Sequence, residues 1–157
     1  MKILFVCLGN ICRSPLARGI MHHKISNKGL NAEVDSAGFE DYHIGEPADP
    51  RSAEIAMKNG VSLDGHSARQ FDVEDFDKFD RIYVMDEKNY KDVIDLARNQ
   101  HDLDKVDYIM NVVTPGTDTP VPDPYYGGEE GFSNVFLMLD TACEKIARDI
   151  ENNKKSQ

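Results

Sequence analysis

Residues 3–15 read ILFVCLGNICRSP, and this stretch decides the fold. Its first four residues, Ile3 to Val6, form a short continuous apolar run, which is typical of a buried parallel strand. Pro15 stands where the first turn of a helix tolerates proline, and apolar residues then recur at helical spacing as far as Gly29. The stretch therefore predicts a strand, a tight loop and a helix, with Cys7 where the strand ends.

The same alternation continues along the chain. Further strands are predicted at residues 32–36, 81–85 and 106–110, and further helices at residues 50–60, 88–98 and 131–150. Residues 114–124 hold four prolines and are predicted to be a loop. The alternation implies a single-domain α/β fold, flavodoxin-like or Rossmann-like, with a four-stranded parallel sheet and helices on both faces. We expect the domain to span residues 1–151, with a polar tail at 152–157.

The composition limits the classes of molecule that we expect this protein to bind. The chain has 157 residues and a formal net charge of −10, from 18 basic and 28 acidic side chains. This charge argues against nucleic acid and an anionic membrane as main partners, and no stretch approaches the length of about 18 apolar residues that a membrane span needs. Cys7, Cys12 and Cys143 are an odd number without the spacing of a disulfide framework or a metal site. We expect a cytoplasmic protein with no metal and no cofactor.

The loop after the first strand has the features of an anion-binding site that also holds a nucleophile. In parallel α/β sheets, ligands bind at the carboxyl ends of the strands, where Cys7 is expected to lie. Backbone N–H groups from Leu8 to Arg13, at the start of a helix, can bind a tetrahedral dianion and stabilise a thiolate. The guanidinium of Arg13 can grip two phosphate oxygens at once, and the Ser14 hydroxyl can hydrogen-bond the sulfur.

A simpler interpretation treats Cys7 as a buried cysteine in a nucleotide-type turn, with Arg13 on the surface. Gly9 and Asn10 favour the anion-binding interpretation, because both residues suit the close or left-handed backbone that such a loop requires. The preceding strand and the proline-led helix favour it as well.

A phosphate ester also needs a proton for its leaving group, and Asp123 is the candidate source. It lies in the segment VPDPYYGG, residues 121–128, where the two flanking prolines fix the direction of the carboxylate. Tyr125 and Tyr126 could form an aromatic wall beside a planar substrate ring. The spacing alone is equally consistent with a proline turn in which Asp123 caps a helix.

Together these residues resemble a known family, the low molecular weight protein tyrosine phosphatases, from about residue 3 to residue 150. The loop from Val6 to Pro15 matches the phosphate loop of the family, and Asp123 to Gly127 is similar to its general-acid loop. Further blocks that look like family motifs are DSAG (35–38), GEPADPR (45–51), HSARQ (66–70), DFDKFD (75–80) and MDEKN (85–89). The resemblance implies a metal-independent, two-step hydrolysis of phosphotyrosine.

The resemblance also implies a role for each site residue. Cys7 is the nucleophile that forms a phosphocysteine, Arg13 clamps the phosphoryl oxygens, and Asp123 protonates the leaving tyrosinate and then activates water. The phosphate loop comprises Leu8, Gly9, Asn10, Ile11, Cys12 and Ser14, with Asn10 and Ser14 tied into a supporting network by His66. The mouth of the site is lined by Leu8, Tyr42, Tyr125 and Tyr126. Cys12 can pair reversibly with Cys7 and protect it from over-oxidation.

The implied partners are a phosphotyrosine-containing protein or peptide, and inorganic phosphate as product and weak inhibitor. Relatives that resemble arginine-phosphate phosphatases tend to carry threonine where this chain has Ile11, so Ile11 favours phosphotyrosine. Family members often have tryptophan in place of Tyr42 and threonine in place of Phe39, and both positions are expected at the rim of the cleft. The partner preference of those relatives is therefore not carried over to this chain.

Two functions of other classes compete with the phosphatase. A thiol-dependent arsenate reductase on the same fold needs two further cysteines on a mobile loop near the middle of the chain, and none lies between Cys12 and Cys143. A non-catalytic phosphoprotein-binding module would normally lack the nucleophile, the arginine or the acid, and all three are present.

Elsewhere in the chain, we expect His22 and His23 to be solvated, Cys143 to pack in the core, and the acidic run 72–80 to form a solvated face.

Overall fold

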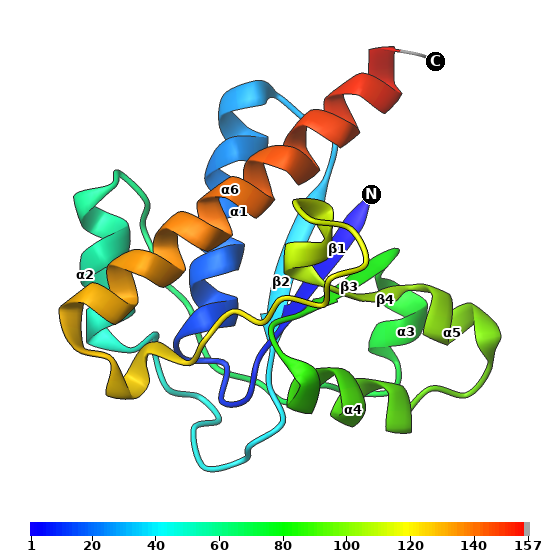
Figure 1. Cartoon of the computed structure of the whole chain (residues 1–157), viewed down its shortest axis with the longest axis horizontal. Coiled ribbons are helices and arrows are strands. Elements are labelled where there is room, and N and C mark those ends of the chain that lie inside the picture. The colour runs from blue at the N-terminus through cyan, green and yellow to red at the C-terminus, as the bar shows by residue number, and fades with distance from the viewer. Residues whose placement is uncertain (156–157) are drawn as a thin grey trace.

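The structure is a computed structural model that describes residues 1–155, except for the side chains of residues 126, 154 and 155. Its centre is a four-stranded sheet in which all described pairings are parallel (Figure 1). The strands, in their order across the sheet, are β2 (Glu33–Ala37), β1 (Lys2–Val6), β3 (Arg81–Val84) and β4 (Val106–Tyr108). The predicted parallel α/β fold is thereby confirmed.

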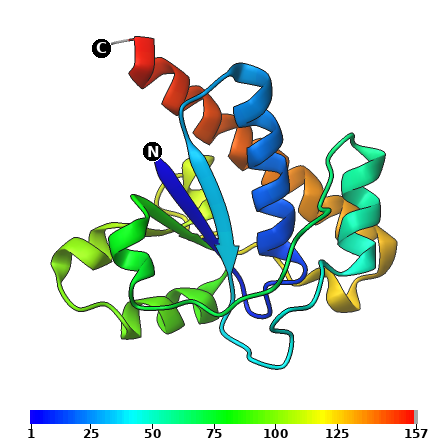
Figure 2. The ribbon, with the colours of Figure 1, turned by 180° about the vertical axis from the view of Figure 1, so that it is seen from behind.

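Helices cover both faces of the sheet (Figures 1 and 2). One side carries α1 (Arg13–Lys28), α2 (Pro50–Lys58) and α6 (Gly128–Lys155). The other side carries α3 (Asp75–Lys78), α4 (Glu87–Asp95) and α5 (Gln100–Asp104). Two 3₁₀ segments, η1 (Ile109–Val112) and η2 (Pro124–Tyr126), complete the regular structure of residues 1–155.

Strand β1 divides the core in two. Ile3 and Phe5 are fully buried in the cluster beneath α1 and α6, while Leu4 and Val6 are fully buried in the cluster on the opposite face. Successive side chains of a strand point to opposite faces, so a continuous apolar run is what a strand covered on both sides requires. The run that predicted this strand therefore also anchors both halves of the core.

The phosphate loop lies where the strand order reverses. β1 pairs with β2 on one side and with β3 on the other, and Val6 is in register with Ala37 and Val84. The chain moves outward from β1 to β2 and then crosses to β3, so the carboxyl end of β1 is a topological switch point. Cys7 follows directly at this point.

Several elements differ from the sequence-based expectation. α6 begins at Gly128 and runs to Lys155, so it includes Gly131 and extends into the predicted polar tail. α4 ends at Asp95, and the predicted fourth strand turns into a 3₁₀ segment after Tyr108. α3 and α5 were not predicted, because helices of four and five residues are too short to show a helical period.

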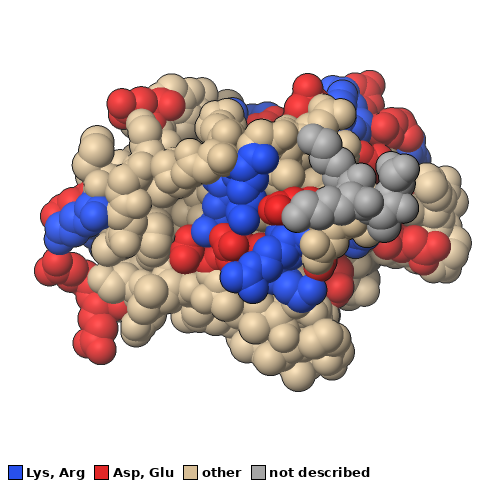
Figure 3. Space-filling model, turned by 90° about the horizontal axis from the view of Figure 1, so that it is seen from above, with Lys and Arg blue, Asp and Glu red and all other residues tan. Residues whose placement is uncertain are grey.

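On the end of the molecule where the strands begin, charged side chains gather in groups that are separated by wide uncharged areas (Figure 3). Lys and Arg side chains lie beside Asp and Glu side chains on this face (Figure 3). Within the acidic run 72–80, Asp75 is buried rather than solvated, because its carboxylate accepts hydrogen bonds from Arg69. His22 and His23 are exposed and Cys143 is buried, as predicted. None of the helices that the structure describes is long and apolar enough to cross a membrane.

Candidate active site

Cys7 lies at the floor of the loop between β1 and α1. Its side chain is 2% exposed, and its sulfur lies 3.0 Å from the Ser14 hydroxyl oxygen. α1 begins at Arg13, two residues earlier than Pro15 suggested, so Arg13 and Ser14 both belong to the first helical turn. The first turn of a helix has backbone N–H groups without intrahelical partners, which suit an anion held above the sulfur.

Asn10 fixes the shape of this loop. Its backbone is left-handed, with φ of 56°, and its side-chain amide donates to the hydroxyls of Ser14 at 2.8 Å and Ser36 at 2.9 Å. Its side-chain oxygen accepts from the backbone N–H of Arg69 at 3.0 Å, and its carbonyl lies 2.7 Å from His66 Nε2. Burial lowers the pKa of His66, so the neutral ring donates to this carbonyl. The loop is therefore tied to β2 and to the segment 66–69.

Gly38 lies directly beneath the loop. A Cβ atom at this position would lie 2.8 Å from the Asn10 nitrogen and 2.9 Å from the Leu8 oxygen, closer than side chains tolerate. The backbone of Phe39 donates to the same Leu8 oxygen at 2.7 Å. The absence of a side chain at residue 38 thus lets the segment that follows β2 support the phosphate loop by direct backbone contact.

Arg13 is 3% exposed and is held from several sides. Its Nη1 atom donates to Asp86 Oδ2 at 2.7 Å and to the Val121 carbonyl at 2.9 Å, while Nη2 lies 4.0 Å from Asp123 Oδ2. Burial lowers the pKa of Arg13, but the nearby Cys7, Asp86 and Asp123 outweigh this effect and raise it. The guanidinium therefore remains charged in a place from which water is largely excluded.

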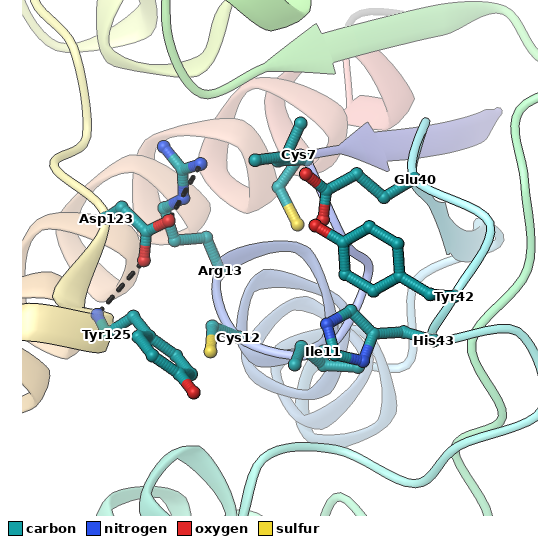
Figure 4. Close-up of a pocket in the computed structure, with 11 residues that line it drawn as sticks. Cys7, Ile11, Cys12, Arg13, Glu40, Tyr42, His43, Asp123 and Tyr125 are labelled. Carbon is teal, nitrogen blue, oxygen red and sulfur yellow. Dashed lines mark hydrogen bonds and ion pairs between the residues drawn. The ribbon is translucent and has the colours of Figure 1, made fainter.

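Asp123 faces Arg13 and also caps a helix. Its Oδ1 atom accepts from the backbone N–H of Tyr125 at 3.0 Å at the start of η2, while Oδ2 faces the guanidinium (Figure 4). The structure thus shows the helix cap that one interpretation of this aspartate expects, and the cap uses only Oδ1. The cap fixes the carboxylate at the edge of the site.

Cys12 differs from Cys7 in its environment. Burial, followed by the charges of Asp49 and Cys7, raises the pKa of Cys12 to about 12. Cys12 is thus a protonated thiol at neutral pH.

A pocket of about 360 Å³ opens above these groups (Figure 4). It is lined by Cys7, Leu8, Gly9, Ile11, Cys12, Arg13, Glu40, Tyr42, His43, Asp123 and Tyr125. The structure therefore brings most of the predicted site residues into one cavity, with Asn10, Ser14 and His66 behind it. The side chain of Tyr126 lies outside the described part of the chain.

Among the described residues, no group of three or more His, Cys, Asp or Glu side chains could hold a metal ion.

Sequence reasoning gave no role to three residues near this pocket. Asp86 lies two residues after the end of β3, and its place near the carboxyl end of a strand next to β1 is a signal that could have identified it. Glu40 and His43 lie in the irregular segment between β2 and α2, where no periodic pattern marks which side chains face the cavity.

A sequence model of a known family, described as low molecular weight phosphotyrosine protein phosphatase, matches residues 2–156. The chain belongs to this family. A Synechocystis relative whose name places it among the low molecular weight protein-tyrosine-phosphatases is 47% identical, over 93% of this chain and 94% of its own. The low molecular weight phosphotyrosine protein phosphatase of Schizosaccharomyces pombe is 39% identical over 95% and 96%.

Solved structures agree with this family assignment. The protein tyrosine phosphatase of Entamoeba histolytica superposes with a TM-score of 0.89 at 41% identity, covering 98% of this chain and 99% of its own. The protein is thus a protein-tyrosine phosphatase of the metal-independent cysteine phosphatases, and its substrates are phosphoproteins.

Proposed function

We propose that Cys7, Arg13 and Asp123 carry out the hydrolysis of phosphotyrosine in two steps. The observation that carries this proposal is their convergence. A buried sulfur, a buried guanidinium and a carboxylate from three segments of the chain line one pocket, although Asp123 lies more than 100 residues after Arg13. Phosphoryl transfer depends on positioning and charge stabilisation, and these three groups supply a nucleophile, a clamp and an acid.

In the first step the Cys7 sulfur attacks phosphorus from the floor of the pocket. The bond between phosphorus and the tyrosine oxygen breaks, and the leaving oxygen takes a proton from Asp123. Arg13 and the N–H groups of the loop stabilise the charge on the three phosphoryl oxygens. The phosphoryl group is then bonded to sulfur.

In the second step water attacks the phosphocysteine. Asp123, now ionised, accepts a proton from the water, and the bond between phosphorus and sulfur breaks. The electron pair returns to the Cys7 sulfur, which the Ser14 hydroxyl stabilises by a hydrogen bond across 3.0 Å. Inorganic phosphate leaves, and its affinity for the same N–H groups makes it a weak competitive inhibitor.

Phosphotyrosine is the substrate that fits the pocket walls. Tyr42 and Tyr125 line the pocket and can flank a planar ring. A solved structure of Wzb from Vibrio vulnificus, 28% identical to this chain, holds benzylphosphonate, in which a CH2 group joins a phenyl ring to the phosphonate. We further propose that the protein works in the cytoplasm and binds neither nucleic acid nor membranes. The net charge of −10 and three unpaired cysteines support these points.

The other two functions receive less support. Cys143 is fully buried in the core, where it cannot take part in a relay of cysteines for arsenate reduction. A module that only binds phosphoproteins needs no general acid, whereas Asp123 lines the same pocket as Cys7.

The test is phosphate release from a phosphotyrosine peptide and from the same peptide with phosphoserine. We expect release from phosphotyrosine alone, and a loss of at least about 10³-fold in Cys7→Ser, which lacks the nucleophile. Near-normal turnover by Cys7→Ser, or tight peptide binding without release by the intact protein, would contradict the proposal.

A further inference from the structure

Arg51 connects the phosphate loop to the segment that carries Asp123. It lies in the first turn of α2, where Asp49 caps the helix by accepting from the Arg51 backbone N–H at 2.8 Å. The Asp49 carboxylate also receives the Arg51 side chain, at 3.1 Å from Nε and 3.0 Å from Nη2. Asp49 in turn donates its backbone N–H to the Ile11 carbonyl at 2.8 Å. One end of this connection is therefore the phosphate loop.

The other end of the connection is the segment that carries the general acid. The third nitrogen of the Arg51 guanidinium, Nη1, donates to the Tyr125 carbonyl at 2.9 Å. The backbone N–H of the same Tyr125 holds Asp123 Oδ1 at 3.0 Å. Residue 125 is thus fixed at its carbonyl by Arg51, while its N–H orients the acid.

Two aromatic rings hold the guanidinium in this place. Its central carbon lies 4.8 Å from the centre of the Tyr125 ring and 4.7 Å from the centre of the Phe132 ring of α6. A planar guanidinium stacks on aromatic faces and donates in its plane at the same time, which an ammonium cannot do. Arg51 therefore positions the Tyr125 ring as well as its carbonyl.

We infer that Arg51 is a positioning residue, which holds Asp123 at the distance from the phosphate loop at which it can protonate the leaving group. This inference rests on the proposed function, because it assigns Arg51 a task only if Asp123 is the general acid. Arg51 does not contact the reacting atoms in this arrangement. Its loss should therefore affect proton delivery, not phosphate binding.

The experiment compares two aryl phosphates. Phenyl phosphate has a poor leaving group that needs a proton, whereas 2,4-dinitrophenyl phosphate has a good leaving group that does not. We expect Arg51→Ala to lower kcat/KM for phenyl phosphate on the order of 10–10²-fold, and that for dinitrophenyl phosphate by no more than about threefold. Arg51→Lys should show the same losses as Arg51→Ala. A lysine ammonium cannot donate in one plane to both the Asp49 carboxylate and the Tyr125 carbonyl, as the guanidinium does.

Arg98→Ala is the matched control. Arg98 has a side chain that is 41% exposed, against 42% for Arg51, pairs with Asp77 and Asp102, and lies over the Phe76 ring. Arg98 is not among the residues that line the pocket, so we expect Arg98→Ala to keep the wild-type ratio of kcat/KM between the two substrates. Circular dichroism of each variant checks that the fold is kept, and Arg51→Lys retains the charge if Arg51→Ala does not fold.

The double variant Arg51→Ala/Asp123→Asn separates positioning from a general structural effect. If Arg51 acts through Asp123, its removal should reduce the phenyl phosphate rate no further once the acid is gone. Equal losses of Arg51→Ala on both substrates, or additive losses in the double variant, would overturn the inference. A wild-type protein that hydrolyses neither ester, or an Asp123→Asn variant with no leaving-group dependence, would instead overturn the proposed function.

Discussion

Arg13 and Asp86 form an ion pair with 2.7 Å between Nη1 and Oδ2, and the arginine side of this pair is almost fully buried. Asp86 holds Arg13 with one oxygen and caps α4 with the other, which accepts from the Asn89 backbone N–H at 3.0 Å. The first helical turn after β3 is therefore tied to the first helical turn after β1. The carboxylate fixes the direction in which the guanidinium presents its remaining donors.

The two tasks of Asp86 can be separated by two substitutions. Asp86→Asn keeps a capping oxygen but removes the charge, so we expect kcat/KM for an aryl phosphate to fall on the order of 10–10²-fold, with little change in stability. Asp86→Ala should lose activity similarly and also about 1 kcal/mol of stability, because the cap is lost. Steady-state kinetics and urea unfolding measure the two effects. Wild-type kcat/KM in Asp86→Asn would show that the pair does not orient Arg13.

Gly38→Ala tests the support beneath the phosphate loop. The new Cβ would lie 2.8 Å from the Asn10 nitrogen, so the loop must move, and a displacement of about 1 Å can reduce the rate about 10²-fold. Gly131→Ala is the control. Its Cβ would meet ordinary contacts at 3.7 Å or more, and alanine favours the helix by up to about 1 kcal/mol. We expect Gly131→Ala to keep its activity, and full activity in Gly38→Ala would contradict this account.

Cys12 is expected to act as a reversible protector of Cys7. After oxidation of Cys7 by peroxide to a sulfenic acid, the Cys12 sulfur can displace water and form a disulfide, which thiols reduce. Because the pKa of Cys12 is raised to about 12, this closure should become faster as the pH rises toward that value. Activity recovered with dithiothreitol after peroxide should be lower in Cys12→Ser than in the wild type. Equal recovery in both proteins would leave Cys12 with a packing role only.

His66 should contribute to the pH dependence of stability. Burial lowers its pKa in the folded protein, whereas an unfolded histidine has a pKa of about 6.5. As the pH falls below about 6.5, the unfolded state takes up a proton before the folded state does, so the free energy of unfolding decreases. The stability is complete above the unfolded pKa and is lost as the pH falls through the folded pKa.

Urea unfolding at about pH 7.5 and about pH 5.5 measures this effect. His66→Gln retains a donor for the Asn10 carbonyl but does not titrate, so it should lose less stability between the two pH values than the wild type. The exposed histidine His101, changed to Gln, is the control. A decrease in His66→Gln as large as in the wild type would show that His66 is not a source of the acid sensitivity.

The alternation of strands and helices could be predicted from sequence, because buried parallel strands and amphipathic helices have distinct periods. Ile3 to Val6 and the helix after Pro15 are the clearest cases. The start of α6 could not be predicted in this way, because Gly128 and Gly131 are poor helix formers. Packing of the first turns of α6 against η2 and α2 offsets this disadvantage.

In the active site, too, the residues that lie close together in the sequence could be predicted, and the contacts between distant residues could not. Cys7 and Arg13 lie six residues apart in one loop, so their chemistry is visible in the sequence. The contacts of Arg51 with Tyr125 and Phe132 join residues more than 70 positions apart, and no local pattern reveals them. The rim residues Glu40 and His43 are equally hidden, because an irregular segment has no period.

Helix α6 follows all three reacting residues in the chain, and this order affects when a newly synthesised chain can become active. The ribosome synthesises Cys7, Arg13 and Asp123 before any residue of α6, yet this helix buries the apolar stripe of α1 and supplies the Phe132 ring. A nascent chain that already contains every reacting group still lacks the element that packs them together. We therefore expect phosphatase activity only after α6 has been synthesised and has packed against α1.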